Sequence, residues 1–171
     1  MRATTTHSDI LGKMPKKVKL YIVRHADAGS RSAWTGEDEL RPLSRKGRRQ
    51  AKGLAEILAG RPIVRLVASP ALRCVETLDP VAAQLGLTVE TDRRLAEGGR
   101  GDDALAVADE LAMVDQAGVL CSHGDVIPDL LSELKVRGTQ FHHDLTWPKG
   151  SAWVLSRKGT AWTDADFLPA P

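Results

Sequence analysis

The stretch "VKLYIVRHADAG", residues 18–29, passes from a run of apolar and β-branched residues directly into a charged pair, Arg24 and His25. A run of this kind is typical of a central strand that is covered on both faces of a sheet. Small and polar residues follow at once, which indicates that the strand ends there. Ligands of α/β proteins bind beyond the carboxyl ends of strands, so this pair indicates a functional site.

The composition is that of a single globular domain. The chain has 171 residues, of which 42% are hydrophobic and 27% are charged, which suffices for one hydrophobic core. We expect residues 1–17, which are polar and without periodicity, to be a flexible N-terminal segment, and residues 18–171 to form the domain. The 24 Lys and Arg against 22 Asp and Glu leave a net charge of +2. This charge is too small to indicate a nucleic-acid or membrane partner.

The cysteine content and the hydropathy indicate where the protein works. Cys74 and Cys121 are the two cysteines, too sparse for a disulfide framework and compatible with a reducing compartment. No apolar run approaches the roughly 18 residues of a membrane span, and residues 1–17 lack the apolar core of a signal peptide. We therefore predict a soluble cytoplasmic protein.

Strands and helices are predicted to alternate along the chain. After the first strand, further strands are predicted at residues 63–69, 87–90, 117–122 and 151–156, with 160–162 as a partner for the last one. Helices are predicted from Ser44 to Gly60, from about Pro70 with a break at Pro80, from Asp102 or Asp103, and after residue 123. This order predicts a three-layer α/β/α fold with a mostly parallel central sheet.

Basic residues stand at three strand ends that such a sheet brings to one edge. Arg24 and His25 end the first strand, Arg73 lies one turn into the helix after the second, and His123 follows residues 117–122. Arginine binds phosphate oxygens in bidentate fashion and keeps its charge. Cationic neighbours lower the pKa of a histidine, which keeps its lone pair available. The pattern therefore predicts an anion site that contains a nucleophile.

The predicted site can transfer a phosphoryl group. A neutral His25 can attack phosphorus and form a phosphohistidine intermediate that water later hydrolyses. Arg24, Arg73 and His123 would stabilise the charge that grows on the equatorial oxygens. Backbone amides at the helix start after Gly124 would add to the phosphate cradle.

An ester substrate also needs a proton donor for its leaving oxygen. Glu97, in "RRLAEGG", is the carboxyl residue best placed to reach the site, and its environment there could give it a suitable pKa. Weaker candidates for this acid are Asp27, Asp38 and Glu39.

Other chemistries fit the sequence less well. His142 and His143 would face opposite sides of a strand and lack a third ligand, so we predict no metal site. No arginine occurs in the six residues after Cys74 or Cys121, which argues against a cysteine-dependent phosphatase loop. We predict no cofactor.

Four segments resemble, in order, the motifs of the histidine phosphatase (phosphoglycerate mutase-like) superfamily: "YIVRHADAG", "RPLSRKGRRQA", "LVASPALRCVETL" and "VLCSHGDVI". The similarity runs from about residue 18 to 135. Short phosphohistidine phosphatases of the SixA type look closest, and the phosphatase domain fused to some MutT-type Nudix hydrolases is similar too. The resemblance implies the phosphoglycerate mutase-like fold.

The resemblance also implies roles for individual residues. His25 would be the phosphorylated nucleophile, and the phosphate pocket would be formed by Arg24, Arg73 and His123. The arginine of the "RPL" segment, Arg41, is nominated as a further phosphate ligand. Glu97 falls where many members place their proton donor, although the SixA branch often lacks one. Ala26 replaces a frequent glycine, and the threonine and asparagine of mutases are missing, which argues against a mutase.

We therefore predict a metal-independent phosphohydrolase that acts through a covalent phosphohistidine. Its partner would be a phosphorylated small molecule, such as a phosphate ester or nucleotide phosphate, or a protein phosphorylated on histidine. The alternative is a catalytically weak module of the same fold that binds a phosphorylated ligand or regulates a partner. The sequence leaves the substrate and the oligomeric state open.

Overall fold

The computed structural model describes residues 17–113 and 116–171, so the predicted flexible segment lies outside the described residues except for Lys17. The strands are β1 Val18–Arg24, β2 Ile63–Ala68, β3 Val89–Thr91, β4 Ala117–Ser122, β5 Gln140–Phe141, β6 Ala152–Lys158 and β7 Ala161–Leu168. The helices are α1 Arg45–Leu58, α2 Leu72–Leu85, α3 Gly101–Leu111 and α4 Val126–Val136, with short 3-10 helices η2 Arg31–Ala33, η3 Asp38–Leu40 and η4 Arg93–Leu95.

The strands form one mixed sheet in the order β3-β2-β4-β1-β6-β7-β5. Neighbours among β1 to β4 pair in parallel, and β6 is antiparallel to both of its neighbours. Arg24 pairs with Ser122, and Ala68 pairs with Cys121. The carboxyl ends of β1, β2 and β4 therefore lie at one edge of the sheet, as predicted.

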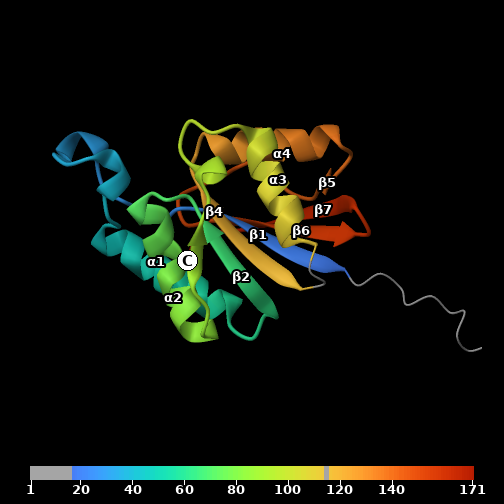
Figure 1. Cartoon of the computed structure of the whole chain (residues 1–171), viewed down its shortest axis with the longest axis horizontal. Helices are drawn as coiled ribbons and strands as arrows, with labels where there is room; N and C mark the ends of the chain where they lie inside the picture. The colour runs from blue at the N-terminus through green and yellow to red at the C-terminus, as the bar shows by residue number, and fades with distance from the viewer. Residues whose placement is uncertain (1–16, 114–115) are drawn as a thin grey trace, which may run out of the picture.

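Helices cover both faces of this sheet (Figure 1). Along β1, Leu20 and Ile22 belong to the core that packs under α3 and α4, whereas Tyr21 and Val23 belong to the core under α1 and α2. This alternation is the two-residue period of a strand buried on both sides. The predicted three-layer α/β/α architecture is confirmed.

The first two helices agree with the sequence-based expectation in one detail and differ from it in another. The predicted cap of α1 is present, since Ser44 Oγ accepts a hydrogen bond from Gly47 N at 3.0 Å. Helix α2, however, continues through Pro80, so the predicted break is wrong. Leu78 and Val81 on either side are fully buried in the core. This packing outweighs the cost of about 3 kcal/mol of a proline inside a helix.

The start of α3 was also predicted wrongly. The helix begins at Gly101 with Arg100 as its N-cap, and the carboxylate of Asp102 pairs with the Arg100 guanidinium at 2.7 Å instead of capping the helix. A Cβ on Gly101 would lie 2.6 Å from the backbone carbon of Asp129 in α4. The close approach of α4 therefore favours glycine at this position and fixes the beginning of α3 there.

The C-terminal part contains more regular structure than predicted. Strand β5, of two residues, lies within the stretch 135–149, where no strand was predicted, and it pairs with β7. Strand β7 extends from the predicted partner at 160–162 to Leu168. A two-residue strand is too short to produce a readable period.

Across residues 17–113 and 116–171, no helix combines the length and the hydropathy that a membrane crossing requires.

Candidate active site

The candidate site lies where β1, β2 and β4 end, and the backbone around His25 is fixed from three sides. Its amide donates to the Ser122 carbonyl of β4 at 3.0 Å. The Ala26 amide donates to Thr77 Oγ1 of α2 at 2.9 Å. The Gly150 amide donates to the carbonyl of His25 at 3.2 Å. The position of His25 is thus set by the sheet, by α2 and by the turn before β6.

The imidazole of His25 has a defined tautomer and an altered pKa. Its Nδ1 lies 2.8 Å from the carbonyl oxygen of Ala26. Because a carbonyl only accepts, Nδ1 carries the proton and Nε2 keeps its lone pair. Burial, together with the charges of His123, Arg73 and Arg24, lowers the pKa of His25 to about 3. His25 is therefore uncharged at neutral pH, as predicted from the sequence.

The second histidine lies against the first, with ring centroids 5.3 Å apart. Arg73 Nη2 is 3.5 Å from His123 Nδ1 and can donate a hydrogen bond to it. The Nε2–H of His123 then donates to Ser69 Oγ at 2.8 Å. Both Arg73 and His123 are 1% exposed. We call His25, Arg73 and His123 the pocket floor.

Arg24 contributes an unpaired donor to the same edge. Its Nη1 donates to the Trp147 carbonyl at 2.8 Å. Its Nε, like Nε of Arg73, is buried without a hydrogen-bond partner among the described residues. Leaving such groups unpaired costs free energy. A tetrahedral anion bound between them would remove this cost.

Gly124 has a steric role that the sequence did not reveal. A Cβ at this position would lie 2.6 Å from Arg24 Nη2. Of the amides expected after Gly124, that of Val126 is already bound by Asp125 Oδ1 at 3.0 Å. The absence of a side chain at Gly124 gives the Arg24 guanidinium its place beside the floor, and phosphate binding by the Gly124 amide stays a prediction.

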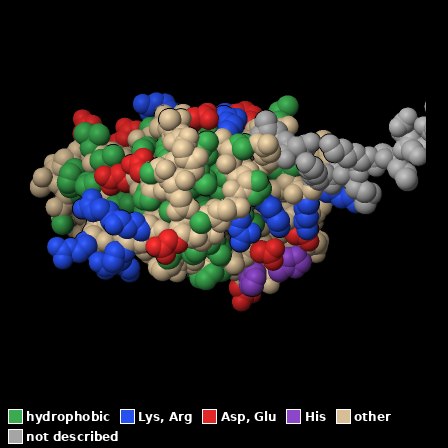
Figure 2. All heavy atoms as spheres, turned by 90° about the horizontal axis from the view of Figure 1, so that it is seen from below, with side chains coloured by type: hydrophobic (Ala, Val, Ile, Leu, Met, Phe, Trp, Pro, Cys, Tyr) green, Lys and Arg blue, Asp and Glu red, His purple; other side chains and the backbone are tan. Residues whose placement is uncertain are grey.

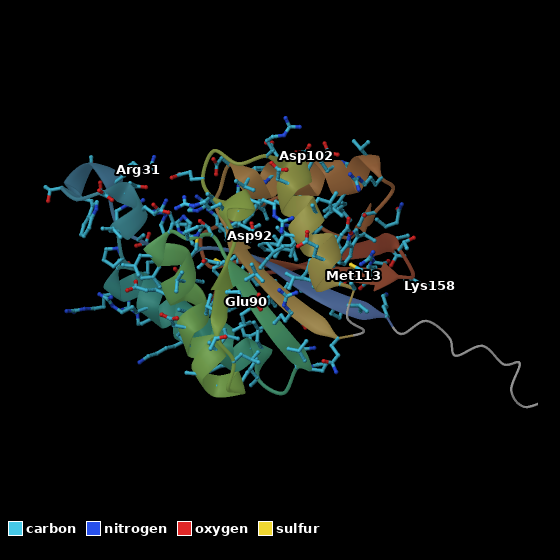
Figure 3. All side chains as sticks on the ribbon, viewed as in Figure 1. Arg31, Glu90, Asp92, Asp102, Met113 and Lys158 are labelled. Atoms are coloured by element: carbon cyan, nitrogen blue, oxygen red, sulfur yellow. The ribbon has the colours of Figure 1, made fainter. Side chains whose placement is uncertain are left out.

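Two carboxylates and an arginine line the mouth of the pocket. Arg73 Nη2 lies 3.0 Å from Glu97 Oε2 and 3.1 Å from Asp38 Oδ2. Arg31 bridges the same two carboxylates, and Figure 3 shows it on the segment that projects beside α1. We call Arg31, Asp38 and Glu97 the rim. A cavity of about 310 Å³ is lined by Arg73 and His123 of the floor and by Asp38 and Glu97 of the rim, together with neighbours that include Ser69.

The carboxyl groups considered as proton donors differ in their surroundings. Partial burial raises the pKa of Asp38, but hydrogen bonds from Arg41 and Arg31 and the charge of Arg73 lower it to about 2. A hydrogen bond from Ser44, supported by Lys149 and the amide of Gly29, lowers the pKa of Asp27 to about 2. Both groups are ionised at neutral pH, which removes them as acids. Glu97 lies at the rim, as the sequence suggested.

The side chain of Arg41 is buried, and its guanidinium contacts the segment between Ala28 and Asp38. Its Nη1 donates to the Ala28 carbonyl at 2.8 Å and its Nε to Asp38 Oδ1 at 2.9 Å. The guanidinium thus anchors the segment that carries Asp38. Its part in phosphate binding stays a prediction.

Sequence reasoning missed three residues of the site. Ser69 and Thr77 lie within the segment "LVASPALRCVETL", where the position of Thr77 four residues after Arg73 on a helix was a usable signal. Thr77 Oγ1 donates to the Arg73 carbonyl at 2.6 Å. Arg31 lies in a loop without periodicity, where no pattern indicated it. Among the described residues, no cluster of three or more His, Cys, Asp or Glu could hold a metal ion.

The family model of the histidine phosphatase superfamily (branch 1) matches residues 20–105, half of the chain. The chain belongs to this superfamily. A relative from Mycolicibacterium smegmatis, an 8-oxo-(d)GTP phosphatase, is 33% identical over 165 residues, which are 93% of this chain and 51% of the relative. The chain thus spans about half the length of that relative.

Solved structures show the same fold. A putative phosphohistidine phosphatase SixA from Nakamurella multipartitia is 26% identical with a TM-score of 0.73, covering 93% of this chain and 98% of that one. A protein histidine phosphatase SixA complexed with tungstate is 22% identical with a TM-score of 0.70, covering 88% and 94%. The chain is therefore a domain of the histidine phosphatase superfamily with SixA-like architecture.

Proposed function

We propose that this domain hydrolyses phosphohistidine in proteins through a covalent intermediate on its own His25. The observation that carries the proposal is the state of the nucleophile: Nδ1 of His25 is committed to the Ala26 carbonyl, and the ring is uncharged at neutral pH. The lone pair on Nε2 is thus available for attack on phosphorus without any need for a separate base.

The reaction would follow from this geometry in two steps. The lone pair of His25 Nε2 forms a bond to phosphorus while the bond between phosphorus and the leaving nitrogen breaks and that nitrogen keeps its electron pair. Water then attacks the phosphorus, inorganic phosphate leaves, and Nε2 recovers its lone pair. Arg24, Arg73 and His123 would stabilise the charge on the equatorial oxygens in both steps.

The proposed substrate class follows from the state of the acids. Asp27 and Asp38 are ionised, and the Glu97 carboxylate is held between Arg31 and Arg73. An alkoxide leaving group depends on a proton donor, whereas an imidazole leaves readily without one. A phosphoryl group on nitrogen suits this site best. For an ester, Glu97 is the proposed donor once it is released from the two arginines.

A second candidate substrate is a nucleoside phosphate. It is favoured by the 33% identity to the 8-oxo-(d)GTP phosphatase, which covers nearly the whole of this chain. The floor binds only the transferred phosphoryl group in either case, so the two candidates differ in what the rim must accommodate.

The test compares three substrates at equal concentration in the presence of EDTA: a histidine-phosphorylated peptide, p-nitrophenyl phosphate and 8-oxo-dGTP. We expect the phosphopeptide to give the highest kcat/KM and His25→Ala to abolish turnover. Rapid acid-free quenching followed by mass spectrometry should show one phosphoryl group on the peptide that contains His25. The matched control is His143→Ala, an exposed histidine remote from the floor.

Each other outcome has a defined meaning. Fastest hydrolysis of 8-oxo-dGTP would replace the protein substrate by a nucleotide and leave the His25 mechanism intact. Turnover that persists in His25→Ala would overturn the mechanism. Binding of the phosphopeptide without turnover in the native chain would identify a phospho-ligand-binding module.

A further inference from the structure

The outer face of α1 carries a row of positive charges. Arg45, Arg48, Arg49 and Lys52 are all exposed and follow the spacing i, i+3, i+4, i+7, which places them along one side of a helix over about 10 Å. We call these four residues the cationic stripe. Figure 2 shows Lys and Arg side chains gathered at the end of the molecule where α1 lies.

The stripe is unpaired within the domain. No carboxylate of the described ranges lies within ion-pair distance of its four side chains. Arg65 pairs with Glu90, but Arg61 and Arg93 are exposed and, like the stripe, have no ion-pair partner among the described residues. What distinguishes the α1 face is that four such cations lie along one side of one helix.

This arrangement is unfavourable for the isolated helix. Like charges stand four residues apart at Arg45 and Arg49 and again at Arg48 and Lys52, which destabilises a helix. The first turn of α1 has no acidic residue, although the N-terminal end of a helix dipole favours negative charge. Docking of an anionic surface would relieve both effects.

Exposed apolar groups lie next to the start of the stripe. Trp34 and Leu40 are 38% and 57% exposed and belong to the segment 28–40, which we call the flap. A depression of about 260 Å³ between the flap and the beginning of α1 is lined by residues that include Trp34, Pro42 and Ser44. Exposed tryptophan and arginine are the residue types that anchor protein interfaces.

The stripe is also connected to the site. Ser44, which caps α1, donates its hydroxyl to Asp27 Oδ2 at 2.6 Å, two residues from His25. The flap carries Arg31 and Asp38 of the rim. A partner that presents a phosphoryl group to the floor would therefore meet the flap first and α1 beside it.

From these observations we propose that the cationic stripe and the flap form the docking surface for a protein substrate with an acidic face and an apolar side chain at its edge. This inference rests on the proposed function. A nucleic acid fits the surface less well, because the stripe is short and the neighbouring mouth presents the carboxylates Asp38, Glu39 and Glu97, which repel a longer polyanion.

The test uses two helical peptides that carry one phosphohistidine each and differ only in a row of Glu or of Gln at every third or fourth position. In the native chain we expect a lower KM for the Glu peptide. The double variant R48E/R49E should raise that KM about fivefold or more and leave kcat unchanged, because exposed charges act on association. The Gln peptide should be unaffected.

A control variant, a variant of Trp34 and direct binding measurements complete the experiment. The variant K135E/R137E makes the same change in net charge on exposed residues at the C-terminal end of α4 and should leave the KM of both peptides unchanged. Trp34→Ala should raise the KM of a Glu peptide that contains a leucine. Binding of fluorescent unphosphorylated peptides and of an oligothymidylate is measured in parallel by anisotropy.

The outcomes separate the two proposals. Absence of hydrolysis of both phosphopeptides, with the Glu peptide still bound through Arg48 and Arg49, refutes the proposed function but supports the docking surface. Equal KM values for the two peptides in the native chain overturn the docking surface. The docking surface is also overturned if oligothymidylate binds more tightly than the Glu peptide and this binding is lost in R48E/R49E. That result would assign the stripe to nucleic acid.

Discussion

The floor and the rim belong to the same candidate site but are held in different ways. His25, Arg73 and His123 are between 1% and 6% exposed and extend from strand ends and a helix that the core fixes. The side chains of Arg31, Asp38 and Glu97 are 59%, 34% and 43% exposed and hold one another by ion pairs. Exposed pairs are weak and screened by salt. The floor is thus rigid before substrate arrives, whereas the rim can rearrange around it.

Removal of a floor residue should have the largest effect. We expect Arg73→Ala to lower kcat/KM by about 10³-fold, because the preorganised donor is lost while Asp38 and Glu97 keep their negative charge at the mouth. Steady-state kinetics on the phosphopeptide and a thermal melt measure this effect. If the variant does not fold, Arg73→Lys replaces it and should still lose about 10²-fold, because a lysine lacks the planar fork. A loss no greater than that of Arg31→Ala would show that floor and rim are equivalent.

A change next to the floor should have an intermediate effect. Gly124→Ala places a Cβ within 2.6 Å of Arg24 Nη2, so the guanidinium must move. We expect kcat/KM to fall about 10²-fold, with a weaker affinity for tungstate or vanadate measured as inhibition. Gly118→Ala is the matched control, because the contacts of a Cβ there start at 3.4 Å. If Gly124→Ala is as active as the native chain, the position of the Arg24 guanidinium does not matter for activity and this prediction is wrong.

The burial of the floor should also appear in the pH dependence of stability. The pKa of His25 is lowered to about 3 by burial, against about 6.5 in the unfolded chain. Between these values only the unfolded chain binds the proton, so the contribution of His25 to stability is complete above about pH 6.5 and is lost as the pH falls toward 3. Urea titrations at pH 7 and pH 5 should show a decrease of on the order of 1 to 2 kcal/mol in the free energy of unfolding.

The matched variant isolates this effect. In His25→Gln the difference between the two pH values should shrink by that amount, since the exposed histidines His142 and His143 remain in both proteins. An identical pH dependence in the two proteins would mean that the imidazole is accessible to water and that the floor is not rigid.

A rim substitution should have the smallest effect and should depend on the substrate. Glu97→Gln removes a carboxylate that competes with phosphate for Arg73. We expect kcat for the phosphopeptide to change less than about twofold, and kcat for an alkyl phosphate ester such as glycerol phosphate, whose alkoxide leaves poorly, to fall about tenfold through loss of the proposed proton donor. Equal effects on both substrates would remove Glu97 from the mechanism and leave it as part of the rim alone.

The same contrast explains what the sequence could and could not predict. The residues of the floor follow buried strands, whose apolar runs and parallel order are visible in the sequence and bring Arg24, His25 and His123 to one edge. The hydrogen-bond partner of each side chain could not be predicted from the sequence. Whether Arg41 binds phosphate or holds the flap depends on the path of an irregular loop, which no period describes.

Local rules failed where tertiary contacts outweighed them. A proline usually interrupts a helix, yet α2 continues through Pro80 because its flanks are buried. An aspartate usually caps a helix, yet Asp102 pairs with Arg100 and α3 begins where Gly101 meets α4. Neither the depth of burial nor the distance between two helices can be obtained from a single stretch of chain.

The anchoring of His25 by β4, α2 and the turn before β6 has a consequence for how proteins of this architecture can diversify. None of the three anchors, Ser122, Thr77 and Gly150, belongs to the flap. Insertions or exchanges between residues 28 and 40 can therefore alter substrate choice while His25, the proposed nucleophile, keeps its place. New specificities become accessible by changing one surface loop, without rebuilding the reaction centre.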